Sequence, residues 1–217
     1  MTPLIAQTQP PTLNLVFFGD SLTEGVPHFN GETDTMPFMV NQQFPGATYI
    51  KLGYRGQTSG YLREKFDGWL CAQYKADMEN VLVLWTGTND LALNTTNVVP
   101  QVYANMVALA QAAHSAGWKV VVVTVISRSN YFVSTQAQAE FPSEQATLNQ
   151  MIHSSTEFDA VADPAPQLTD TSDTTLFWDG CFQFVASFCD SVRSSNEHAI
   201  CKHVPPLRVL QAKVRFS

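Results

Sequence analysis

The chain has 217 residues, of which 45% are hydrophobic and 14% charged, and its formal net charge is −7. This length fits one domain with a sizeable core, and the composition argues against a disordered chain. A net negative charge argues against a nucleic-acid-binding protein, which would carry a basic surface, and against binding to an anionic membrane. A neutral or apolar small molecule is still compatible with this charge.

Residues 1–11 are expected to form a flexible lead-in that ends at Pro10-Pro11. They contain neither Lys nor Arg and have only a weak apolar centre, so they do not resemble a signal peptide. No apolar run approaches the roughly 20 residues that span a bilayer. We therefore expect a protein without a membrane span, cytoplasmic by default, with its four cysteines reduced.

The next residues predict a short buried strand followed by a distinctive turn. Leu15-Val16-Phe17-Phe18 is an apolar run, Gly19 ends it, and Asp20-Ser21-Leu22 follows. Ser21 would thus leave the carboxyl end of a strand, at the edge where ligands bind in open α/β sheets. The alternative is a turn in which Asp20 or Ser21 only caps the following helix.

The remaining elements alternate between strands and helices up to Ala162. The apolar pattern predicts further strands over 47–52, 81–85, 120–126 and 159–162. It predicts helices over 35–44, 61–77, 99–116 and 144–158, with loops over 53–60 and 86–90. This alternation predicts a single α/β domain over residues 12–182, a three-layer α/β/α sandwich around a mainly parallel five-stranded sheet.

Three short blocks follow predicted strands, and together they resemble a known family. Gly19-Asp20-Ser21-Leu22 comes after the first strand, Gly56-Gln57-Thr58-Ser59 after the second, and Gly87-Thr88-Asn89-Asp90 after the third. They resemble the signature blocks of the GDSL esterases, also called SGNH hydrolases, and they occur in the family's order. The resemblance extends over about residues 13–179 and implies the flavodoxin-like SGNH hydrolase fold.

The resemblance assigns a role to one residue in each block. It implies that Ser21 is the nucleophile, and that its backbone N–H, the backbone N–H of Gly56 and the side-chain amide of Asn89 form an oxyanion hole. Glycine suits a backbone donor that must approach the substrate closely, and an asparagine amide offers a fixed N–H donor without net charge. Each block taken alone has a simpler interpretation as a turn or a helix cap.

A fourth block departs from the family pattern. The family carries Asp-x-x-His near its C-terminus, where the His is the general base and the Asp orients it. Here Asp179 and Gly180 match, but Phe182 occupies the position of the His. Phe cannot accept a proton, and losing the triad histidine of a serine hydrolase costs on the order of 10⁶-fold in rate. Asp179 would therefore orient a base that the sequence does not show.

Other histidines are candidates for the missing base. His28 lies shortly after the nucleophile block, and His198 and His203 lie in the C-terminal segment. His28 could reach the mouth of the site, and the family pattern does not constrain His198 and His203. His114 and His153 fall in predicted helices and are expected to be ordinary helix residues.

Residues 183–217 form an atypical tail. The family normally continues with a helix that closes the domain, whereas here no sustained apolar period extends beyond Val192. We hypothesise that the chain from about Phe182 results from a shifted reading frame; the alternative is a family member that has lost its base. The Cys and His residues of the tail match no common zinc spacing, so neither a metal nor a cofactor is expected.

Two functional hypotheses follow. The first is a serine ester hydrolase of acylesterase or lipase-like type that acts through a Ser21 acyl-enzyme on a small-molecule substrate, either an acyl ester or an O-acetylated carbohydrate. The second, which Phe182 favours, is a catalytically impaired relative that binds such a ligand without efficient turnover. A flavodoxin-like protein that binds phosphate or nucleotides is a third interpretation, which the lack of a glycine-rich phosphate loop with Lys disfavours.

Overall fold

The structure is a computed structural model that describes residues 12–25, 35–93 and 97–168. In this part of the chain, five strands form one sheet in which every neighbouring pair is parallel, in the order β2-β1-β3-β4-β5. The strands are β1 (Leu13–Gly19), β2 (Thr48–Gly53), β3 (Glu79–Trp85), β4 (Lys119–Val123) and β5 (Ala160–Ala162). This is the flavodoxin-like strand order, so the predicted fold class is confirmed.

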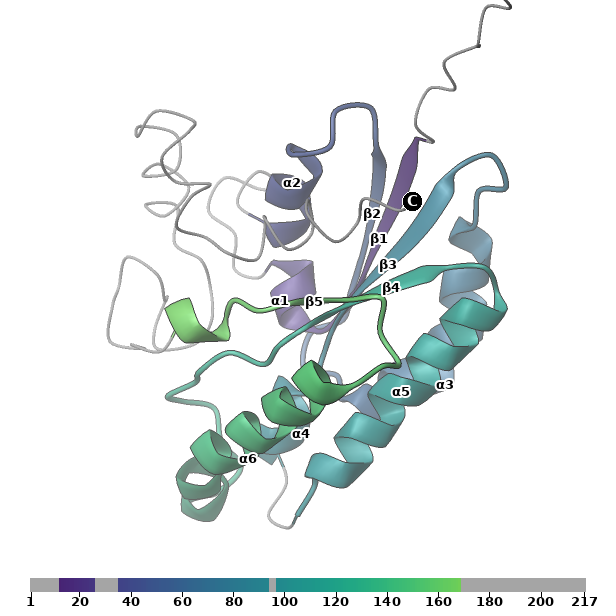
Figure 1. The fold of residues 1–217 in the computed structure, drawn as a ribbon. Coiled ribbons are helices and arrows are strands. Elements are labelled where there is room, and N and C mark those ends of the chain that lie inside the picture. The colour runs from purple at the N-terminus through teal and green to yellow at the C-terminus, as the bar shows by residue number, and fades with distance from the viewer. Residues whose placement is uncertain (1–11, 26–34, 94–96, 169–217) are drawn as a thin grey trace, which may run out of the picture.

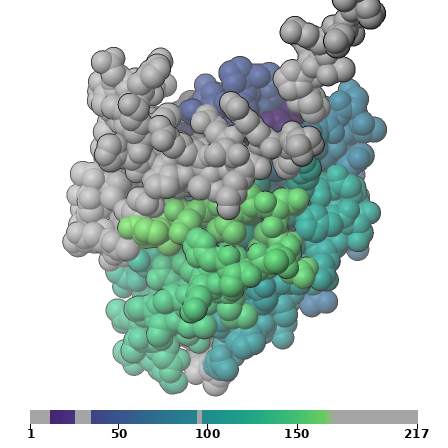
Figure 2. Space-filling model, viewed as in Figure 1, coloured from purple at the N-terminus to yellow at the C-terminus, as the bar shows by residue number. Residues whose placement is uncertain are grey.

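Helices cover both faces of the sheet. One face carries α3 (Ser59–Leu70), α4 (Thr88–Leu93), α5 (Val99–Ser115) and α6 (Thr135–Ser154), and the other carries α1 (Ser21–Glu24) and α2 (Met36–Asn41) (Figure 1). Two short 3₁₀ turns, η2 (Cys71–Gln73) and η3 (Ala165–Gln167), complete the described elements. In the space-filling view, the residues from α6 to η3 form the middle of the visible face (Figure 2).

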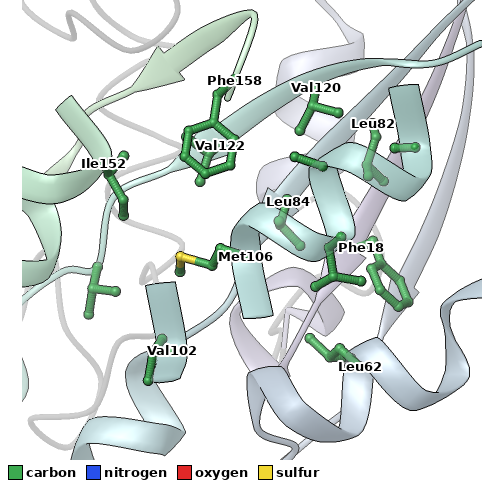
Figure 3. Close-up of a cluster of buried hydrophobic side chains, with 14 of the residues drawn as sticks. Phe18, Leu62, Leu82, Leu84, Val102, Met106, Val120, Val122, Ile152 and Phe158 are labelled. Atoms are coloured by element: carbon green, nitrogen blue, oxygen red, sulfur yellow. The ribbon is translucent and has the colours of Figure 1, made fainter. Parts of the chain in front are cut away.

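Alternate residues of the strands enter two separate apolar cores, because successive side chains of a strand point to opposite faces. The core under α3, α5 and α6 (Figure 3) contains Val16, Phe18, Leu62, Leu84, Met106 and Ile152, among others. The core on the α1–α2 side contains Leu15, Phe17, Leu22, Val40 and Val83, among others. Strands β1 and β3 are therefore buried on both faces, which explains their nearly continuous apolar sequences.

The amino-terminal edge of the sheet holds a buried polar network that shortens α3. The helix predicted over 61–77 ends at Leu70, which corrects its predicted end by several residues. Beyond the helix, the Asn14 amide donates to the Gln73 carbonyl at 2.8 Å and to Asn80 Oδ1 at 2.8 Å. These side-chain bonds fix a turn that the apolar spacing does not reveal.

Strand β4 is also shorter than predicted. It ends at Val123 instead of continuing to Ile126. The reason is that the Asn149 side chain on α6 binds the backbone of Val125, accepting from its N–H at 2.9 Å and donating to its carbonyl at 2.8 Å. A side chain therefore satisfies the backbone groups that would otherwise have continued the ladder.

Two further predictions of element boundaries are wrong. The loop predicted over 86–90 already contains the start of α4 at Thr88. The helix predicted over 144–158 is α6, which begins at Thr135 and ends at Ser154. Its cap is Ser134, whose side chain accepts the N–H of Ala137 at 3.1 Å.

Candidate active site

The three neighbouring strands β2, β1 and β3 end in register with one another. Gly19 at the end of β1 is the register partner of Gly53 in β2 and of Trp85 in β3. Because the strands are parallel, the segments that follow them emerge at the same carboxyl edge of the sheet (Figure 1). Ser21, Gly56 and Asn89 lie in these three segments, just beyond the strand ends.

Two glycines allow the segments to approach one another closely. A Cβ atom on Gly19 would lie 2.1 Å from the carbonyl oxygen of Trp85 and 2.3 Å from Thr23 Oγ1. A Cβ atom on Gly53 would lie 2.1 Å from the backbone nitrogen of Glu24. Helix α1 can therefore pack against the ends of β2 and β3 only because these positions lack side chains.

Ser21 is the first residue of α1. The Asp20 side chain caps this helix by accepting the N–H of Leu22 at 2.9 Å, and Gly25 ends it in the left-handed conformation at φ +76°. Leu22 is buried against the second core, whereas Ser21 is half-buried. The turn thus buries its apolar residue and leaves the serine partly accessible at the carboxyl edge.

The loop after β2 carries Gly56 at an exposed position. Its start is tied to β1, because the N–H of Tyr54 donates to the Gly19 carbonyl at 2.9 Å. Gly56 has φ +73°, which other residues adopt only with strain, and no atom of the described residues lies within 4 Å of the place where its Cβ would be. The loop therefore requires glycine for its backbone conformation and leaves open space beside it.

Asn89 lies in α4 and is buried, and its side-chain amide is bonded on both sides. The Nδ2 atom donates to the carbonyl of Gln57 at 2.9 Å, and the Oδ1 atom accepts from Arg128 at 3.4 Å. Arg128 also donates to the Thr88 carbonyl at 3.4 Å. An amide nitrogen has two N–H groups, so the bond to the Gly56 loop leaves Asn89 a second donor.

Arg128, in the loop after β4, also contacts the candidate site, and no sequence pattern indicated it. Its guanidinium also donates to the carbonyls of Asn130 and Tyr131, at 2.8 and 3.1 Å. It thereby ties the loop after β4 to Asn89. Arg128 is far from any of the three sequence blocks, and no local pattern marks an arginine that bonds mainly to backbone carbonyls.

Two buried carboxyl groups lie beside these residues. The pKa of Asp20 is raised from 3.8 to about 7: burial is the largest cause and Asp90 adds to it, while the Leu22 N–H and Arg128 act in the opposite direction. Burial also raises the pKa of Asp90, against the opposing effect of its hydrogen bonds from Ser59. The edge that holds Ser21 therefore contains two buried carboxyl groups with raised pKa, a feature common at functional sites.

The histidines that the structure describes do not supply a base to Ser21. His114 Nε2 lies 2.8 Å from an Asp159 oxygen that also accepts the N–H of Val120, at the amino-terminal edge of β4. His153 pairs with Asp163 at 2.9 Å, just after β5. Strand β5 is three strands away from β1, about 14 Å at the usual spacing.

The fourth block and the other histidines lie outside the described residues. These positions are Asp179, Phe182, His28, His198 and His203. Within the described residues, no group of three or more His, Cys, Asp or Glu side chains is placed to hold a metal ion. No helix in that part of the chain is long and apolar enough to cross a membrane.

Comparison with solved structures shows the same fold in GDSL proteins. A member of the lipolytic G-D-S-L family from Veillonella parvula matches with a TM-score of 0.62 and 15% identity, over 93% of this chain and 96% of that one. A GDSL-like lipase from Bacteroides thetaiotaomicron matches with a TM-score of 0.61 and 20% identity, over 87% and 88%. The acetylxylan esterase Axe2 from Geobacillus stearothermophilus matches with a TM-score of 0.60 and 14% identity, over 94% of both chains.

Sequence comparison identifies the family. Among curated protein sequences, none matches the chain. The sequence profile of the GDSL-like lipase/acylhydrolase family, however, matches residues 17–181, a span that includes the first three sequence blocks and the fourth as far as Cys181. The chain therefore belongs to the GDSL-like lipase/acylhydrolase family.

Proposed function

We propose that the protein is a serine ester hydrolase in which Ser21 is the nucleophile and the backbone N–H groups of Ser21 and Gly56, with the Asn89 amide, form the oxyanion hole. The observation that carries this proposal is a hydrogen bond between the two segments that hold Gly56 and Asn89. The Asn89 amide donates to the carbonyl of Gln57, which is the residue after Gly56. This bond and the matched strand ends support a single site made from three separate blocks.

In the proposed reaction, the Ser21 hydroxyl oxygen attacks the carbonyl carbon of the ester. The negative charge that develops on the carbonyl oxygen is stabilised by the three donors, whose preorganisation lowers the barrier without reorganising water. A base takes the hydroxyl proton and passes it to the alcohol oxygen as the bond from the carbonyl carbon to that oxygen breaks, which leaves an acyl group on Ser21. Water attacks the acyl-enzyme and releases the acid, so no cofactor or metal takes part.

The proposed reaction needs a proton acceptor, and the sequence does not identify one. Asp179 is proposed to orient a base, but Phe182 stands at the position of the family's histidine. A hydroxyl nucleophile without an adjacent base remains weak at neutral pH. We therefore expect turnover to be slow, and His28, His198 and His203 are the residues to be tested as substitutes.

The proposed substrates are small neutral esters, including short acyl esters and O-acetyl groups on carbohydrates. The net charge of −7 disfavours anionic ligands. One solved structure with the same fold is described as an acetylxylan esterase, which is consistent with an acetylated carbohydrate as one member of this class.

The second candidate function is ligand binding without efficient turnover at the same site. Phe182 favours it, because loss of the base leaves the oxyanion donors but not an activated serine. Such a protein would be stabilised thermally by a carbohydrate ester or its product without consuming it.

The two functions are separated by comparing the purified wild-type protein with its Ser21→Ala variant on p-nitrophenyl acetate and butyrate. For an esterase, we expect Ser21→Ala to lower the rate by at least about 100-fold, since it removes the nucleophile. Ser115→Ala, which changes an exposed serine on α5, is the matched control and should keep the wild-type rate. A rate that is indifferent to Ser21 would overturn the esterase proposal, and ligand-induced stabilisation without turnover would favour the binding protein.

A further inference from the structure

Ser59 and Asp90 belong to two of the sequence blocks but have no role in the proposed reaction. The structure joins them. Asp90 Oδ1 accepts the hydroxyl of Ser59 at 2.6 Å, and its two carboxylate oxygens lie 3.1 and 2.9 Å from the Ser59 backbone nitrogen. Both side chains are buried. A carboxylate that accepts both donors of one residue in a buried place makes a strong contact with defined geometry.

The direction of these hydrogen bonds follows from their neighbours. The Asn105 amide donates to Ser59 Oγ at 3.0 Å, so the serine hydroxyl directs its own proton to Asp90. Asn105 is fixed in this orientation because its Oδ1 atom accepts from Gln101 at 3.1 Å and from Arg63 at 3.4 Å. Asp90 is therefore the last acceptor in a chain of hydrogen bonds that begins at Arg63 on α3 and Gln101 on α5.

The contact connects the same two segments that hold the candidate oxyanion donors. Asp90 is next to Asn89 in α4, and Ser59 begins α3 directly after the Gly56 loop. The bond from Asn89 to the Gln57 carbonyl is the other link between them. The loop is thus held at both ends: at its start the N–H of Tyr54 donates to the Gly19 carbonyl of β1, and at its end the N–H of Ser59 donates to Asp90.

We propose that Asp90 is a positioning residue: its carboxylate clamps the first turn of α3 against α4, and so fixes the separation between the Gly56 N–H and the Asn89 amide. The inference rests on the proposed function for its catalytic consequence, whereas the clamp itself is a property of the fold. The amino end of α3 carries partial positive charge, which adds to the attraction for a carboxylate there. A displacement of about 1 Å in such a donor costs on the order of 100-fold in rate, so a buried clamp matters to a site whose two donors come from a loop and from α4.

The first test is kinetic and uses Asp90→Asn and Ser59→Ala. Asparagine keeps the size of Asp90 but turns one acceptor into a donor, which then faces the donors of Ser59. We expect kcat on p-nitrophenyl butyrate to fall about 10- to 100-fold while KM changes by less than about 3-fold, because a misplaced oxyanion donor affects the transition state more than the bound ester. The double variant should lose little more than Asp90→Asn alone.

The matched control is Asn14→Ala. It removes a buried amide that makes comparable hydrogen bonds at the opposite edge of the sheet. It should lower the melting temperature as Asp90→Asn does, but leave kcat at the wild-type value. A kcat for Asp90→Asn within about twofold of wild type, or an equal loss in Asn14→Ala, would overturn the proposal.

The second test is hydrogen exchange, which needs no turnover. In Asp90→Asn, the backbone amides of 54–60 and 89–93 should exchange faster together, whereas in Asn14→Ala they should keep their wild-type rates. If wild-type protein hydrolyses neither ester, the proposed function fails and the exchange result decides the clamp alone. Unchanged exchange in these two segments of Asp90→Asn would contradict the clamp whatever the activity.

Discussion

Asp20 shows how a single residue at the candidate site is both structural and ionisable. Its Oδ1 atom caps α1, while Oδ2 is buried and has no hydrogen-bond partner among the residues that the structure describes. Burial raises its pKa to about 7 because a charge without compensating donors is costly in a place that excludes water. The sequence indicated the cap but not this burial, which depends on how α1 packs onto the sheet.

The raised pKa predicts the pH dependence of stability. The folded state binds the Asp20 proton more tightly than the unfolded state does, so the stability from this group is present below pH 3.8 and is lost as the pH rises to about 7. Asp20→Asn keeps the Oδ1 acceptor and stays neutral. Its stability relative to wild type should therefore rise over this interval, by about 4 kcal/mol at most at about 1.4 kcal/mol for each pKa unit.

Thermal unfolding at a series of pH values measures this difference. Asp77→Asn, at an exposed carboxylate, is the control and should differ from wild type by only a small amount. A difference between Asp20→Asn and wild type that stays flat between pH 4 and 8 would show that Asp20 is ionised throughout and would contradict the assigned cause.

At the scale of elements, the sequence predicted helices well where a regular apolar face continued, and badly where a proline interrupted it. The helix predicted over 99–116 is α5, Val99–Ser115, because its apolar spacing is unbroken. The start of α6 was missed because Pro142 lies inside it. Its buried face, which includes Phe141 and Leu148, nevertheless continues through the proline, and Ser134 offers a cap.

Pro142 gives a prediction in which a substitution stabilises the protein. It is exposed, and as a proline it cannot donate to the carbonyl four residues earlier in α6. Pro142→Ala restores this donor and should raise the free energy of unfolding by about 1–3 kcal/mol, measured by urea denaturation. Pro100→Ala is the matched control: Pro100 is in the first turn of α5, where the N–H has no partner in the helix, so stability should change little. A loss of stability in Pro142→Ala would mean that the helix needs its proline.

At the scale of the whole molecule, the alternation of strands and helices was enough to predict the sheet, its layers and the edge that holds the three blocks. Parallel strands bring their carboxyl ends together whatever the details of packing, which is why Ser21, Gly56 and Asn89 could be placed at one edge from sequence. The contacts between the blocks could not be predicted. The link from Asp90 to Ser59 and the reach of Arg128 depend on the three-dimensional approach of α3, α4 and the loop after β4.

The central claim, that Ser21 attacks an ester in this site, is tested most directly by looking for its acyl group. Excess p-nitrophenyl butyrate is mixed with the protein, the reaction is quenched in acid, and the peptides are analysed by mass spectrometry. p-Nitrophenolate leaves without needing a proton, whereas attack of water on the acyl-enzyme needs a base, so the intermediate should accumulate. We predict a butyryl group on the peptide that contains Ser21, absent from Ser21→Ala. Release of p-nitrophenol with no butyryl group on that peptide, or with the group elsewhere, would contradict the account.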